Sequence, residues 1–176
     1  MNTDIEKAPA KLQELVAEVD TGGRKPSGVT ANLIFGVALT WALFQTWYAS
    51  PLPFALRFGV INDTEARAIH LAFALFLAFL AWPAGKRSPR DRVPWQDWVF
   101  AAAGAFASWY LMLFYSSLAL RPGQPTTLDL VISITGLVLL LEATRRAVGA
   151  PMAVLAVLFI AYALFGPHLP DLISHK

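Results

Sequence analysis

The chain has 176 residues, of which 56% are hydrophobic and only 15% are charged, and its mean hydropathy is +0.52. Soluble domains carry about 25% charged residues because their surfaces must be solvated, so a soluble fold of this composition would expose large apolar patches. A net charge of +2 is small for a phosphate-binding face, and the absence of cysteine excludes disulfides, thiolate metal sites and cysteine nucleophiles. The composition therefore predicts an integral membrane protein that does not bind nucleic acid.

The N-terminal region, residues 1–28, is predicted to form a cytoplasmic amphipathic helix and a linker. Residues 1–20 mix charges and contain no apolar core, so we expect no cleavable signal peptide there. Apolar residues recur at helical spacing in this region, at Ile5, Ala8, Leu12, Leu15, Val16 and Val19. The polar face is mainly acidic, unlike a helix that binds anionic lipid. The pattern favours a short surface helix, and docking on the cytoplasmic face of a partner is the alternative.

Five apolar runs follow and predict an all-α membrane domain over residues 29–176, because a helix needs roughly 20 residues to cross a bilayer. The runs cover about residues 30–49, 66–82, 97–120, 126–142 and 148–166. The fourth is the shortest, so a re-entrant or interfacial helix is its alternative. Prolines follow the first three runs, where a helix interior must stop, at Pro51, Pro53, Pro83 and Pro122.

Polar residues at the starts of these runs predict helix caps. Asn62 with Glu65 has the spacing of a capping box before the second run, and Thr126 with Asp129 repeats it before the fourth. Asp97 and Asp129 fall in first turns, where the helix dipole favours a negative charge. Capping accounts for both aspartates.

The basic residues predict one orientation, since cytoplasmic loops are enriched in Lys and Arg. Ten of the fourteen fall on one side of a five-span topology, namely Lys7, Lys11, Arg24, Lys25, Lys86, Arg87, Arg90, Arg92, Arg145 and Arg146. The other side holds Arg57, Arg67, Arg121 and Lys176. This distribution places the N-terminus in the cytoplasm and the C-terminus outside.

His70 lies one turn into the second run, close in sequence to Glu65 and Arg67. An ionisable group inside a membrane is often functional, so a haem ligand or a proton relay is one interpretation. Paired histidine ligation needs a partner at similar depth, and the other histidines, His168 and His175, follow the last apolar run. A hydrogen-bonded structural histidine is therefore the favoured interpretation, and no metal or haem is expected.

Glu142 is followed by Arg145 and Arg146, three and four residues later, so all three share one helix face and can form ion pairs. An anchoring ion pair at the headgroup level is the favoured role. Coupling to a transported ion is the alternative.

Signatures of catalysis are absent from the sequence, which contains no zinc-binding histidine pair on a helix, no nucleophile elbow, no phosphate loop and no dinucleotide fingerprint. We therefore expect no enzyme activity. Small residues around Ala103, over residues 101–107, form a smooth surface suited to close contact with another helix, which the sequence does not identify. Internal repeats and interrupted spans are not evident, so a scaffold or accessory subunit is more consistent with the chain than a complete transport pathway.

Three stretches resemble a known family. They are residues 50–54 (Ser-Pro-Leu-Pro-Phe) with Arg57 and Gly59, residues 62–81 beginning Asn-Asp-Thr-Glu, and residues 142–149 (Glu-Ala-Thr-Arg-Arg-Ala-Val-Gly) continuing to residues 164–170. Together they are similar to the N-terminal membrane region of the fused permeases of TRAP transporters, the tripartite ATP-independent periplasmic systems. The similarity is to the branch that uses a TAXI-type periplasmic solute receptor, and it covers about residues 29–176.

The resemblance implies a secondary transporter of the bacterial inner membrane, driven by a sodium or proton gradient. A periplasmic receptor delivers an organic anion, and a large membrane domain carries the substrate and cation sites and moves against a fixed scaffold. The present chain corresponds to the scaffold, so the coupling cation is expected on the larger domain. The alternative function is a membrane anchor or assembly subunit of a redox or other inner-membrane complex.

Overall fold

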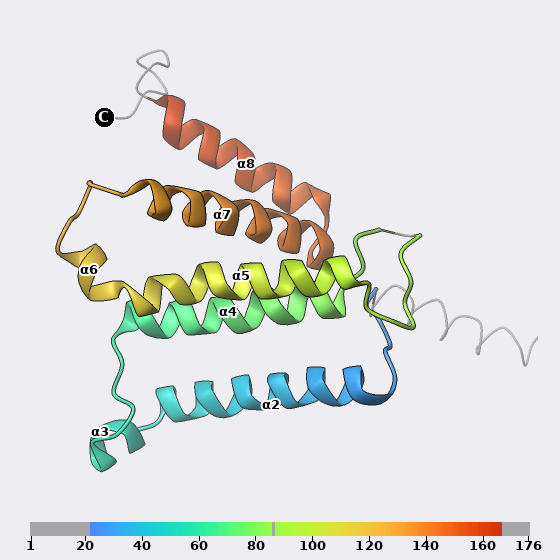
Figure 1. The fold of residues 1–176 in the computed structure, drawn as a ribbon, viewed down its shortest axis with the longest axis horizontal. Helices are drawn as coiled ribbons and strands as arrows, with labels where there is room; N and C mark the ends of the chain where they lie inside the picture. The colour runs from blue at the N-terminus through green and yellow to red at the C-terminus, as the bar shows by residue number, and fades with distance from the viewer. Residues whose placement is uncertain (1–21, 86, 167–176) are drawn as a thin grey trace, which may run out of the picture.

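The computed structural model describes residues 22–85 and 87–166, and these residues form helices without strands. The helices are α2 (Gly28–Ala49), α3 (Leu52–Leu56), α4 (Asp63–Ala81), α5 (Trp95–Leu113), α6 (Tyr115–Ala119), α7 (Thr127–Ala147) and α8 (Ala150–Phe165). The long helices run in alternating directions, with α2 at one edge, α4 and α5 in the middle, and α7 and then α8 at the other edge (Figure 1). The predicted all-α fold is confirmed for these residues. The predicted N-terminal amphipathic helix, His168 and His175 lie outside them.

The core is built around α4, whose residues Leu75, Phe79 and Leu80 have at most 2% of their surface exposed. They contact Ala101 on α5, and Leu139 and Ala143 on α7 complete the buried cluster. In contrast, α2 and α8 contain no buried residue. Apolar helices without a buried face are stable in lipid or against another membrane protein, because water would not solvate them.

The small residues of α5 allow the two central helices to approach closely. A Cβ atom added to Gly104 would lie 3.3 Å from Cβ of Leu75, so α4 leaves no room for a side chain there. On α7, a Cβ atom added to Gly136 would lie 3.1 Å from Cβ of Ala107. Ala103 is half-buried and packs against the core cluster. The smooth surface of α5 thus meets helices of the same chain, α4 and α7.

The third apolar run is not one helix, and the prediction of an uninterrupted span over residues 97–120 is wrong. Helix α5 ends at Leu113, and α6 begins at Tyr115 after Phe114 leaves the helical conformation, with φ −107° and ψ 16°. The ring of Phe114 lies 4.6 Å from that of Tyr110, whose hydroxyl is bonded to Asp129 on α7. Hydropathy does not reveal this break because both sides of it are apolar.

The fourth run is longer than its apolar stretch predicts. Helix α7 continues through Glu142 to Ala147, a length of 21 residues, because its charged residues pair along the helix instead of ending it. Gly149, with φ 110°, then reverses the chain before the 16 residues of α8.

Three helices in the described part of the chain are long and apolar enough to cross a membrane: α2, α4 and α7. Helix α8 is apolar but shorter. These lengths support a membrane protein.

Replacing Gly104 by Leu is expected to lower the free energy of unfolding by about 1–3 kcal/mol, because the added side chain overlaps Leu75 and Phe79 on α4. The matched control is Ala102→Leu, on the exposed side of the same helix. Unfolding by SDS in mixed micelles, followed by circular dichroism, measures the difference. Equal stability of the two variants would contradict the close approach of α4 and α5.

Candidate functional site

A buried charge network lies at the end of the bundle where α4 and α7 finish and α5 and α8 begin. Its centre is Asp97, in the first turn of α5. The Asp97 carboxylate accepts hydrogen bonds from Arg24, on the segment before α2, and from Arg146 on α7, the latter at 2.7 Å. All three side chains are at most 5% exposed. One carboxylate therefore joins three segments that are far apart in the sequence.

Arg24 also satisfies the C-terminal end of α4. Its Nη1 atom donates to the carbonyl oxygens of Phe79 and Leu80 at 2.8 and 3.3 Å, and its Nε atom donates to Pro89 in the α4–α5 connection at 3.2 Å. The last four carbonyls of a helix have no partner within it, and a cation there also complements the helix dipole. Arg24 therefore caps α4 and anchors the segment that precedes α2.

Glu142 extends the network along α7. It accepts hydrogen bonds from Nε of Arg145 and Nε of Arg146, both at 2.7 Å, as the spacing of three and four residues predicts. Arg145 also donates to the carbonyl of Ala84, at 2.8 Å. The guanidinium of Arg146 lies 4.9 Å from the ring centre of Phe79, where the π-electrons favour a cation. The predicted ion pair is thus one part of a larger network that includes Asp97.

A second polar cluster lies at the opposite end, around Asp129. Its Oδ1 atom accepts from the hydroxyl of Tyr110 at 2.5 Å, and Oδ2 accepts from Nη1 of Arg121 at 2.9 Å. The backbone N–H of Thr126 donates to Oδ2 at 2.7 Å and completes the predicted capping box. Asp129 therefore caps α7 and also links it to α5.

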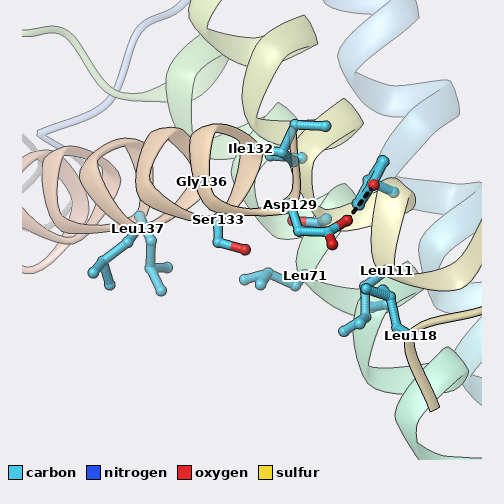
Figure 2. A pocket seen from close by; sticks show the side chains of 13 residues that line it. Leu71, Leu111, Leu118, Asp129, Ile132, Ser133, Gly136 and Leu137 are labelled. Atoms are coloured by element: carbon cyan, nitrogen blue, oxygen red, sulfur yellow. Dashed lines mark hydrogen bonds between the residues drawn. The ribbon is translucent and has the colours of Figure 1, made fainter. Parts of the chain in front are cut away.

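Asp129 also borders a cavity of about 300 Å³ between α4, α5 and α7. Leu71, Ile132 and Leu137 give it mainly apolar walls, and Figure 2 shows Ser133 pointing from α7 toward Leu71. The dashed bond in the figure shows that the Asp129 carboxylate turns toward α5. Both oxygens of this acid are occupied by donors of the protein, so the carboxylate contributes to structure within this arrangement.

The remaining candidates lie along α4. The predicted capping box of Asn62 and Glu65 is present at its start, with bonds of 2.9 and 3.1 Å. Arg67 pairs with Asp63 on the exposed surface at 2.7 Å. His70 is hydrogen-bonded to Trp41 and Gln45 on α2, and it shares a cavity with Arg67 on α4. The hydrogen bonds of Glu142 are made with arginines of α7, so the two candidates belong to separate groups.

Sequence reasoning missed the roles of Arg24 and Asp97. From the sequence, the helix dipole accounts for the position of Asp97, and Arg24 is one of the basic residues that predict the cytoplasmic side. The two are 73 residues apart, and no periodic pattern connects them. The sequence offered one signal, an acidic residue at the start of an apolar helix, because a carboxylate that becomes buried needs a cation as its partner. Helix spacing does not identify that cation.

In comparisons with family models, curated proteins and solved structures, the chain matches none. Functional inference therefore depends on the residues and on their geometry. Within residues 22–85 and 87–166, no group of three or more His, Asp or Glu side chains is placed to hold a metal ion.

Replacing Asp97 by Asn is expected to lower the free energy of unfolding by about 3–5 kcal/mol, because two buried guanidinium groups then lose their shared counter-charge. Asp63→Asn is the matched control, since its pair with Arg67 is largely exposed and should contribute no more than about 1 kcal/mol. SDS titration of both variants in mixed micelles measures the effect. Comparable losses would show that the Asp97 network does not stabilise the fold.

Glu142→Gln should cause a smaller loss, of up to about 3 kcal/mol, because Arg146 keeps Asp97 as a partner. The same titration ranks the two variants. A greater loss for Glu142→Gln than for Asp97→Asn would place the centre of the network on α7.

Proposed function

We propose that the chain is the membrane scaffold, or small permease component, of a TRAP transporter that imports an organic anion with a cation gradient. The observation that carries the proposal is the resemblance of three stretches to this family, together with their positions in the fold. Residues 50–54 form the turn into α3, residues 62–81 form the central helix α4 with its cap, and residues 142–149 contain the Glu142 pair and the turn into α8. The resemblance thus coincides with parts that determine the shape of the bundle.

The distribution of burial supports a scaffold. The centre of the bundle is held by the packing of α4 and by ion pairs at both ends. Helices α2 and α8 lie along the two edges (Figure 1) and contain no buried residue. On α8 the exposed large side chains include Leu158 at 60% and Phe159 at 65%. A fixed domain that supports a larger moving domain requires this combination of a stable centre and broad apolar edges. We assign these edges to lipid and to the large TRAP domain.

Charge placement supports an orientation. Seven of the ten basic residues in the described part of the chain belong to the end that carries Asp97, namely Arg24, Lys25, Arg87, Arg90, Arg92, Arg145 and Arg146. The opposite end carries Arg57, Arg67 and Arg121. We propose that the Asp97 end faces the cytoplasm of a bacterial cell and that five spans place the C-terminus in the periplasm.

Alkaline phosphatase fused after Lys176 is expected to be active, and the same enzyme fused after Arg92 is expected to be inactive, because it folds only outside the cytoplasm. The positions of the basic residues give this result if all five long helices cross. Enzyme activity normalised to fusion protein level is the measurement. An inactive fusion after Lys176 at normal expression would show that one helix does not cross. The first to examine would be α5 and α8, which are not among the three described helices that are long and apolar enough to span a membrane.

Solute uptake into liposomes is expected only when the chain is combined with a large TRAP domain and a TAXI-type receptor. In the described part of the chain, the carboxylates of Asp97 and Asp129 are each occupied by donors of the protein, which supports a role other than substrate binding. Radiolabelled organic anion uptake under sodium and proton gradients is the measurement. Gradient-driven uptake by the chain alone would contradict the scaffold proposal.

A further inference from the structure

Helix α2 is attached to the bundle mainly along α4, and its polar attachment converges on one side chain. Two side-chain hydrogen bonds join α2 to α4 among the described residues, and both end on Nδ1 of His70. The Nε2 amide nitrogen of Gln45 lies 2.7 Å from this atom, and the indole Nε1 of Trp41 lies 3.3 Å from it. Trp41 and Phe44 of α2 also contact the ring of Phe73 on α4, so the bonds to His70 are the polar part of an otherwise apolar contact.

The partners of His70 determine where its proton lies. An indole N–H can donate a hydrogen bond but cannot accept one, so Nδ1 of His70 must be the acceptor for Trp41. This argument holds whichever way the Gln45 amide is turned. A ring whose Nδ1 accepts is neutral and carries its proton on Nε2. The hydrogen bond from Trp41 to α4 therefore requires the uncharged form of His70.

The charged groups near the ring are few. His70 borders an open cavity of about 410 Å³, and the charged or titratable groups that share it are Asp63 and Arg67 on α4 and Tyr48 on α2. Asp63 is paired with Arg67 at 2.7 Å, so its charge is already compensated. Trp41 contacts the His70 ring edge-on, with the ring centres 4.9 Å apart. The aromatic and neutral amide groups of α2 supply no counter-charge for an imidazolium.

We propose that His70 makes the contact between α2 and α4 sensitive to pH. The neutral ring holds α2 against α4, and protonation at Nδ1 releases it. The protonated ring presents an N–H to the N–H of Trp41, so that bond is lost. Gln45 can compensate only by turning its oxygen toward the ring. The open cavity of His70 is shared with Asp63 and Arg67 at the polar start of α4, which provides a route for protons. Histidine is the side chain that ordinarily changes charge between about pH 5 and 8.

The test uses two spin labels in the full chain, which has no native cysteine. Leu39→Cys on α2 and Phe106→Cys on α5 are exposed positions that do not border the His70 cavity. Double electron–electron resonance in lipid nanodiscs should give one narrow distance distribution at pH 8 and a broader or longer one at pH 5, with recovery on return to pH 8. An unchanged distribution at pH 5 would overturn the proposal.

Two further variants test whether His70 causes the pH response of the distance distribution. His70→Asn keeps an acceptor oxygen near the position of Nδ1 and cannot be protonated in this range, so its distribution should remain narrow at both pH values. The matched control, His168→Gln with His175→Gln, should keep the full pH response, because these are the only other histidines. A pH response that persists in His70→Asn, or that disappears in the control, would overturn the assignment to His70.

Discussion

The carboxylate of Asp97 pairs with two arginines that are almost completely buried, and it connects the segments at this end of the bundle. A buried guanidinium without a counter-charge is strongly unfavourable, so Arg24 is enclosed with Asp97, and Arg146 is enclosed with both Asp97 and Glu142. Their enclosure in turn brings the segment before α2, the start of α5 and the end of α7 to one place. The hydrogen bonds from Arg24 to α4 carbonyls and the stacking of Arg146 over Phe79 then connect this place to the core.

The two edges of the bundle differ from its centre in what holds them. Helices α4, α5 and α7 share a buried apolar cluster, close backbone approach at Gly104 and Gly136, and polar links at both ends. Helix α8 contacts the chain through α7, and α2 contacts it mainly through α4. Local stability is therefore expected to decrease from the centre to the edges, since it follows the number of buried apolar contacts. This gradient is consistent with the proposed scaffold, whose edges would meet lipid and the larger domain.

Features with local causes could be predicted from the sequence. The capping boxes at Asn62 and Thr126 and the pairs of Glu142 depend on spacings of three and four residues, which a helix converts directly into contacts. Contacts between distant segments could not be predicted in this way. The link between Arg24 and Asp97 and the partners of His70 on α2 depend on how helices are placed in space. The break at Phe114 lies within an apolar run, next to Tyr110, which is bonded to Asp129 on α7.

The charge network also has a consequence for biogenesis. During synthesis Arg24 leaves the ribosome long before Asp97 and Arg146, so it remains hydrated and fully charged while the early helices insert. Its charge can therefore contribute to the choice of orientation at that stage, and it gains its counter-charge only when the start of α5 has been made. Burial of Arg24 therefore follows the synthesis of α5. A ribosome-bound chain that ends before residue 97 would retain an accessible segment ahead of α2.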